Sequence, residues 1–155
     1  KTALVGESAG GNLCVGIALK MKRRISSVTV HSPFMDFTGS LDRSEHEISD
    51  FTVKEGCLKP LNDIYVGDHR ADNPYISPCY GDYTDFPPTF ITCDQNETLF
   101  ADSMWLYRKL DGSDTEVTMI QMQGAFHAFA ATGTQAPETK RILLENIGFI
   151  KSFMS

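Results

Sequence analysis

Residues 5–12 read VGESAGGN and contain the spacing Gly-x-Ser-x-Gly, with Ser8 between Gly6 and Gly10. The stretch overlaps a short apolar run, TALVG at residues 2–6, which is typical of a buried strand, and it opens an amphipathic segment at residues 9–24. Glycine tolerates the tight backbone that a strand-to-helix turn of this kind requires. The pattern therefore predicts a nucleophile elbow, a turn that lifts the hydroxyl of Ser8 clear of a sheet.

A glycine-rich turn between a strand and a helix can also bind phosphate at the helix N-terminus. In this chain no lysine follows the turn as it does in a phosphate-binding loop, and no second glycine pattern indicates a dinucleotide site. We therefore favour the elbow over the phosphate-binding turn.

The rest of the chain continues to alternate strand and helix patterns. Strands are predicted at residues 27–31, 89–93 and 116–122, and helices at 99–110 and 138–154. Such alternation predicts parallel strands joined by right-handed crossovers, so we expect an α/β fold of about four parallel strands with flanking helices, in one domain over residues 1–155. The first and last helices are expected to bury an apolar stripe each: Leu13, Cys14, Ile17, Ala18 and Met21 in one, and Ile142, Leu143, Ile147, Phe149, Ile150, Phe153 and Met154 in the other.

Residues 34–88 differ from both flanks, because they are polar, aromatic and rich in turn residues. A short helix is expected within them, around residues 59–66. Long excursions of this kind usually carry function, so we expect residues 34–88 to form a cap or pocket wall.

Composition narrows the class of protein. The net charge of -6 argues against a nucleic-acid surface, and the basic residues at 20–24 are explained by a helix C-terminus. No apolar run is long enough to predict a membrane span. The four cysteines, Cys14, Cys57, Cys79 and Cys93, lack the close pairs of a zinc or redox site, so we expect reduced thiols, a cytoplasmic protein, and no metal.

A serine nucleophile needs a general base and a carboxylate that orients the base. His127 follows the last predicted strand and is the candidate base, whereas His31, His46 and His69 are expected to be structural or on the surface. Asp94 and Glu97 both lie in the turn after residues 89–93. Either carboxylate can accept a hydrogen bond from an imidazole, so the residues alone leave the choice of acid open.

Several further motifs accompany the elbow. They are HSPFMD at residues 31–36, NPYISP at 73–78, FPP at 86–88, ETLFADS at 97–103 and GAFHAF at 124–129. Together with GESAGGN they resemble the hormone-sensitive-lipase-type esterases of the α/β-hydrolase fold. In that family the triad acid precedes an Asp-Ser pair by a fixed step, and counting back from Asp102 and Ser103 favours Glu97, with Asp94 as the alternative.

The resemblance implies a serine carboxylic-ester hydrolase that works through an acyl-enzyme and needs no cofactor. Ser8 would attack the ester carbonyl, His127 would transfer the proton, and Glu97 would orient His127. The backbone N–H of Ala9, the residue after the nucleophile, would stabilise the oxyanion. Scattered aromatic residues in the 34–88 insertion favour small, apolar acyl esters as substrates.

The family's other oxyanion donors come from a His-Gly-Gly loop before the elbow, and these 155 residues contain no such motif. The resemblance therefore implies the C-terminal portion of a longer fold. In such a portion the strand at residues 2–6 would be a bare edge, which favours a homodimer through that edge or pairing with the missing N-terminal part. Alternative interpretations are a catalytically silent ligand-binding module or truncated fragment, and a serine peptidase of the oligopeptidase type.

Overall fold

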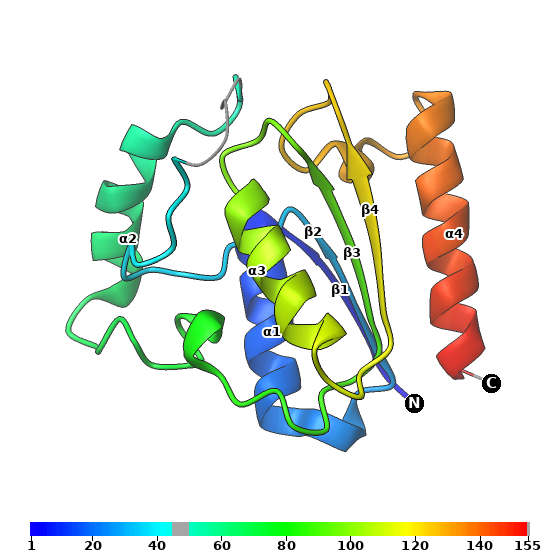
Figure 1. Ribbon diagram of the computed structural model, residues 1–155, viewed down its shortest axis with the longest axis horizontal. Coiled ribbons are helices and arrows are strands. Elements are labelled where there is room, and N and C mark those ends of the chain that lie inside the picture. The colour runs from blue at the N-terminus through cyan, green and yellow to red at the C-terminus, as the bar shows by residue number, and fades with distance from the viewer. Residues whose placement is uncertain (45–49, 155) are drawn as a thin grey trace.

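A computed structural model describes residues 1–44 and 50–154, and these form one parallel sheet with helices on both faces (Figure 1). The strands are β1 (Ala3–Glu7), β2 (Ser27–His31), β3 (Thr89–Asp94) and β4 (Val117–Met122). They lie in the order β1-β2-β3-β4, and all three neighbouring pairs are parallel. The predicted α/β class and the four parallel strands are confirmed.

The helices follow the strands as expected. They are α1 (Ser8–Met21), α2 (Leu58–Val66), α3 (Phe100–Asp111) and α4 (Pro137–Met154), with short 3-10 turns at Lys22–Arg24, Glu55–Cys57, Pro78–Tyr80 and Phe129–Thr132. Helices α1 and α3 cover one face of the sheet, and α4 lies on the other (Figure 1). Each predicted helix and strand has its counterpart, with ends that differ by a few residues.

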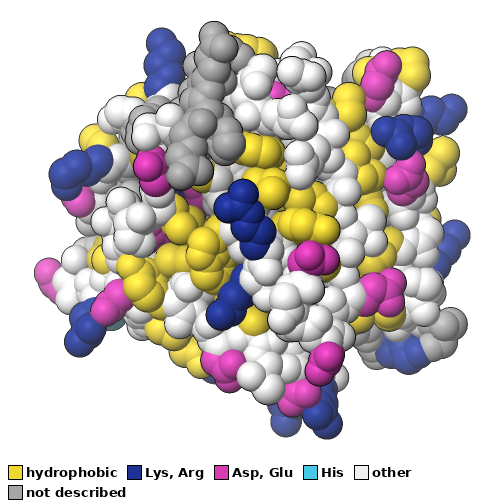
Figure 2. Space-filling model, viewed as in Figure 1, with side chains coloured by type: hydrophobic (Ala, Val, Ile, Leu, Met, Phe, Trp, Pro, Cys, Tyr) yellow, Lys and Arg dark blue, Asp and Glu magenta, His cyan; other side chains and the backbone are white. Residues whose placement is uncertain are grey.

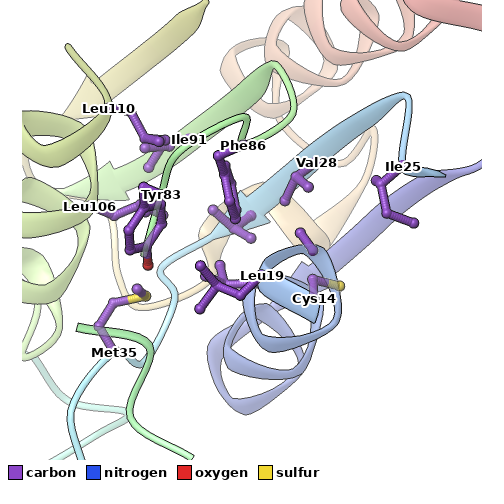
Figure 3. Close-up of a cluster of buried hydrophobic side chains, with 13 residues drawn as sticks. Cys14, Leu19, Ile25, Val28, Met35, Tyr83, Phe86, Ile91, Leu106 and Leu110 are labelled. Carbon is purple, nitrogen blue, oxygen red and sulfur yellow. The ribbon is translucent and has the colours of Figure 1, made fainter. Parts of the chain in front are cut away.

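The larger core lies between the sheet and the α1–α3 layer, as Figure 3 shows. Val28 and Val30 of β2 point into it, together with Leu19 of α1 and Leu106 of α3. Thr29, between the two valines, points to the opposite face, where its hydroxyl donates a 2.8 Å hydrogen bond to Asn146 of α4. A smaller cluster on that face contains Phe90 and Ile142. Alternate side chains of β2 therefore face the helix layers on opposite sides of the sheet.

The apolar stripe predicted for the first helix is only half correct. Cys14 and Ala18 are buried, but Leu13, Ile17 and Met21 are exposed. Helix α1 instead buries a face that contains Val15 and Leu19. Apolar residues occur on most sides of α1, and the sheet covers one of these sides. Periodicity alone therefore predicted a stripe that is shifted by about one residue from the face that contacts the sheet.

The stripe predicted for the last helix needs a similar correction. Ile142 is fully buried, while Ile147 and Met154 are exposed. Asn146, which the apolar pattern omitted, is buried because it accepts the hydrogen bond from Thr29. The residues that face the sheet therefore follow the spacing i, i+4 from Ile142, and one member of that row is polar.

The excursion over residues 34–88 is tied to the body of the fold at several points in its described part. The buried side chain of Asn12 in α1 donates hydrogen bonds of 2.9 Å to the carbonyls of Phe34 and Ile76. Two aromatic contacts join Phe37 to Phe34 and to Tyr65 of α2, with ring centroids 4.5 and 4.7 Å apart. The excursion is therefore a packed layer beside the elbow.

Charged side chains of both signs are interspersed over the face drawn in Figure 2, with apolar side chains exposed between them. Within the described residues, no helix is long and apolar enough to cross a membrane. All four cysteines are free thiols in the structure.

Candidate active site

Ser8 is the first residue of α1, and it follows the last residue of β1 directly. Its φ of +50° lies in the left-handed region, which is uncommon for a residue with a side chain. A Cβ built on Gly6 would collide with the backbone of Gly10 and would lie 2.7 Å from Sγ of Cys14. The close approach of strand and helix therefore requires glycine at position 6, and the predicted elbow is present.

The carboxyl ends of the parallel strands lie together, and the loops that follow the strands meet along this carboxyl edge of the sheet. Glu7 of β1 is in register with His31 of β2, and His31 is in register with Thr92 of β3. Ser8 and Ser32 are the next residues after their strands. The loop after β2 is also tied to the elbow, because the N–H of Phe34 donates a 3.2 Å hydrogen bond to the carbonyl of Ser8.

Glu97 and His127 meet at this edge. Oε2 of Glu97 lies 3.3 Å from Nδ1 of His127, an ion-pair distance at which the contact does not meet the geometry of a hydrogen bond. Both side chains are buried, with 2% of Glu97 and 8% of His127 exposed. Burial raises the pKa of Glu97, and the adjacent His127 ring together with the hydrogen bond from Ser32 opposes that rise. The carboxylate is thus aimed at the ring nitrogen that orients a catalytic histidine.

Asp94, the alternative acid, uses both carboxylate oxygens on backbone groups. Oδ2 accepts a 2.8 Å hydrogen bond from the N–H of Ala125, and Oδ1 accepts one of 2.9 Å from Asn96. These bonds hold the turn after β3 to the loop that carries His127. The geometry favours Glu97 as the partner of His127 and gives Asp94 a structural part.

The second ring nitrogen of His127, Nε2, is also buried, and it has no hydrogen-bond partner among residues 1–44 and 50–154. The structure therefore does not join Ser8 and His127 by a hydrogen bond. An aromatic contact between Phe126 and Phe51, with centroids 5.6 Å apart, covers the neighbouring part of the loop. In structures without substrate, catalytic hydrogen bonds are often long, so this geometry is compatible with a base at His127.

Two of the other histidines are placed as expected. Nδ1 of His31 is 2.7 Å from the hydroxyl of Thr92, and burial lowers the pKa of His31 to about 4. His69 is exposed after α2. His46 lies outside the described residues.

Sequence reasoning missed three contributors to this edge of the sheet. Asn12 stands inside the GESAGGN stretch, where the signal was visible, but no function was assigned to it. Ser32 lies in the Ser-Pro motif, and its hydroxyl donates a 2.8 Å hydrogen bond to Glu97. Arg43 forms a buried ion pair with Asp102 of α3. Hydrogen bonds and ion pairs across 59 to 67 residues leave no periodic trace in a sequence.

A cavity of about 1230 Å³ lies away from this site, at the amino-terminal ends of the strands, beside residues 82–88 and 111–115, which lead into β3 and β4. Ser8, Glu97 and His127 do not line it. Within the described residues, no group of three or more His, Cys, Asp or Glu side chains is arranged to hold a metal ion.

A parallel sheet with a serine on a strand-to-helix elbow, and with an acid–histidine contact at the same edge, defines an α/β hydrolase. The chain belongs to this family, since the family model described as alpha/beta hydrolase fold matches residues 1–131. Solved structures similar to the chain are described as hormone-sensitive lipases, the type that the motifs indicated, and a curated relative is described as an esterase.

An esterase of Acinetobacter venetianus is 25% identical over 158 residues, covering 95% of this chain and 50% of the esterase. A hormone-sensitive lipase from a metagenome library is 27% identical, with a TM-score of 0.87 over 97% of this chain and 54% of that one. A second metagenomic homologue of hormone-sensitive lipase is also 27% identical, with a TM-score of 0.84 over 99% of this chain and 55% of the other. The chain thus spans about half the length of these relatives.

Proposed function

We propose that these residues carry the nucleophile, base and acid of a serine carboxylic-ester hydrolase that acts on small, apolar acyl esters. The observation that carries the proposal is the buried contact of 3.3 Å between Glu97 and His127, at the edge of the sheet where Ser8 stands on its elbow. The relatives described as esterases and lipases support the same reaction class.

In the proposed reaction the Oγ of Ser8 attacks the ester carbonyl while Nε2 of His127 accepts the serine proton. His127 then donates that proton to the departing alcohol, which leaves an acyl-enzyme. Water attacks the acyl group by the same route and releases the acid. Glu97 fixes the orientation of His127 and stabilises its charged form, and the N–H of Ala9 donates to the oxyanion.

The proposed substrate class rests on the layer beside the elbow. Its aromatic rings at Phe34, Phe37 and Tyr65 contact one another, which favours an apolar acyl or alcohol group. Two charged groups there are occupied within the protein: Asp36 accepts hydrogen bonds from Thr38, Ser40 and Leu41, and Arg43 binds Asp102. A charged substrate would therefore find no evident partner among these side chains.

The test is hydrolysis of p-nitrophenyl esters from acetate to palmitate, with a peptide p-nitroanilide as the amide substrate. We expect turnover of the short esters, little of the long ones and none of the amide, and we expect Ser8→Ala to abolish it. Preferred cleavage of the amide would instead favour the peptidase.

A fluorophosphonate probe reports on the Ser8 nucleophile even where turnover is slow. Labelling that disappears in Ser8→Ala supports the hydrolase. A folded protein that is not labelled would favour a ligand-binding module of the same fold.

The free thiols of all four cysteines support a cytoplasmic location as part of the proposal.

A further inference from the structure

Ser32 lies directly after β2, and its side chain is fully buried. Its hydroxyl donates a 2.8 Å hydrogen bond to Oε2 of Glu97 and accepts one of 3.0 Å from the backbone N–H of Ala128. Oε2 is also the oxygen that lies 3.3 Å from Nδ1 of His127. One hydroxyl thus joins the candidate acid to the residue that follows the candidate base.

We propose that Ser32 is a positioning residue of the active site, whose hydroxyl holds the Glu97 carboxylate and the His127 loop in one arrangement. The inference rests on the proposed function, because it gives a residue that touches no substrate a part in ester hydrolysis. The Ser32 hydroxyl donates one hydrogen bond to the carboxylate and accepts another from a backbone N–H. A methyl group can do neither.

The backbone at both ends of this bridge supports the proposal. Ser32 has a φ of +49° and Ala128 a φ of +58°, so both residues lie in the left-handed region that costs free energy for residues with a side chain. The N–H of Ser32 is held by a 2.8 Å hydrogen bond to the carbonyl of Thr92. Strained residues of this kind persist where surrounding contacts fix them, and they cluster at functional sites.

The groups around Glu97 determine how the Ser32 hydroxyl affects the pKa of the Glu97 carboxyl. Burial and the nearby carboxylate of Asp50 raise the pKa of Glu97, while the adjacent His127 ring and the hydrogen bond from Ser32 lower it. The Cys93 thiol also faces Glu97, and its own pKa is raised, by burial first and by that carboxylate second, so it is a neutral neighbour. Without the Ser32 hydroxyl, the carboxylate keeps its unfavourable surroundings and loses the 2.8 Å hydrogen bond that stabilises its charge.

The test compares Ser32→Ala and Ser32→Gly with Ser27→Ala. The glycine variant removes the same hydroxyl but relieves the positive φ, so it separates the hydroxyl from backbone strain. Ser27 is the matched control, because it is the first residue of β2, the strand that Ser32 follows, is equally buried, and its hydroxyl has no hydrogen-bond partner among the described residues. Circular dichroism verifies that each variant is folded.

For both Ser32 variants we expect kcat on p-nitrophenyl acetate to fall on the order of tenfold to a hundredfold, the scale of a lost hydrogen bond to a charged group, with KM nearly unchanged. The acid limb of the kcat/KM profile should move to higher pH, since the acid–histidine pair binds a proton more readily. The ¹³C resonance of the Glu97 carboxyl should titrate at higher pH in both. Ser27→Ala should match the unsubstituted protein in all three measurements.

A folded Ser32→Ala protein with unchanged kcat and unchanged Glu97 titration would overturn the inference. So would recovery in Ser32→Gly, which would assign the effect to strain. If the unsubstituted protein neither hydrolyses esters nor is labelled at Ser8, the proposed function fails by itself. A Glu97 titration that still moves would then establish the contact but remove its catalytic meaning.

Discussion

Arg43 and Asp102 form a buried, two-point ion pair, in which Nε lies 2.7 Å from Oδ2 and Nη2 lies 2.9 Å from Oδ1. Nη2 also donates to the carbonyl of Asp36, and Oδ1 accepts a hydrogen bond from the N–H of Met35. The pair therefore joins the loop after β2, which starts beside the elbow, to α3. Its planar, bidentate geometry suits an arginine and not a lysine.

We expect Asp102→Asn to lower the free energy of unfolding by roughly 3 to 5 kcal/mol, because the change leaves the buried guanidinium of Arg43 without its counter-ion. Urea unfolding followed by circular dichroism measures the effect. Arg70→Ala is the control, since it removes an exposed ion pair with Asp72 and should leave the midpoint where it was. Similar midpoints for both variants would contradict the importance of the buried pair.

The two glycines of the elbow motif should respond differently to alanine. Gly6→Ala places a Cβ against the backbone of Gly10, so we expect loss of the folded protein, or loss of Ser8 labelling if it folds. Gly10→Ala meets no atom within 4 Å and lies inside α1, so we expect it to be tolerated and to stabilise the helix by roughly 0.5 to 1 kcal/mol. The yield of soluble protein and fluorophosphonate labelling measure both variants. Equal damage at both positions would be inconsistent with this packing.

Glu97→Gln and Asp94→Asn distinguish the two candidate acids. If Glu97 orients His127, we expect Glu97→Gln to lower kcat on the order of 10³- to 10⁴-fold, as for the acid of other serine triads. Asp94→Asn removes a charged acceptor from the N–H of Ala125 and should act mainly on stability. Steady-state kinetics with thermal unfolding of each variant separates the effects. The larger loss of kcat in Asp94→Asn would reverse the assignment.

His31 should make stability depend on pH. Burial lowers its pKa from 6.5 to about 4, so the folded protein binds fewer protons than the unfolded chain between these values. The contribution of His31 to the free energy of unfolding is therefore fully present above pH 6.5. It is lost as the pH falls toward 4, which lowers the free energy of unfolding by roughly 3 kcal/mol in total. Glu97, whose pKa is raised, acts in the opposite direction, so the check is a comparison of His31→Gln with the unsubstituted protein in urea from pH 7 to pH 4. A difference between the two that does not change over this range would contradict the prediction.

The edge of β1 should drive association of the 155-residue chain. In the described structure β1 pairs only with β2, and Val5 on this strand is 54% exposed. An uncovered apolar edge favours pairing with another strand, so we expect a dimer in analytical ultracentrifugation at micromolar concentration. Val5→Lys should shift the chain toward monomer, whereas Leu144→Lys, at an exposed position on α4, should not. A monomer before any substitution would rule out pairing of two copies through this edge.

Local sequence patterns were sufficient to predict the helices and strands and their order along the chain. The apolar run before Gly6 and the helical spacing after it predicted β1 and α1, and the same reasoning placed β2, β3, α3, β4 and α4 within a few residues. The apolar stripes of α1 and α4 were less accurate, because the side that a helix buries depends on where the sheet lies. Leu13 and Ile17 satisfied the period and are nevertheless exposed.

The candidate site was also predicted from the chain, since Ser8, His127 and a carboxylate after the third strand stand in the order that this fold uses. Which carboxylate faces the histidine was decided in three dimensions, where Asp94 turns to the backbone and Glu97 reaches Nδ1. The bridge from Ser32 to Ala128 likewise spans 96 residues. Periodicity reports only on near neighbours along the chain, whereas hydrogen bonds and buried charges depend on which loops the parallel strands bring to one edge.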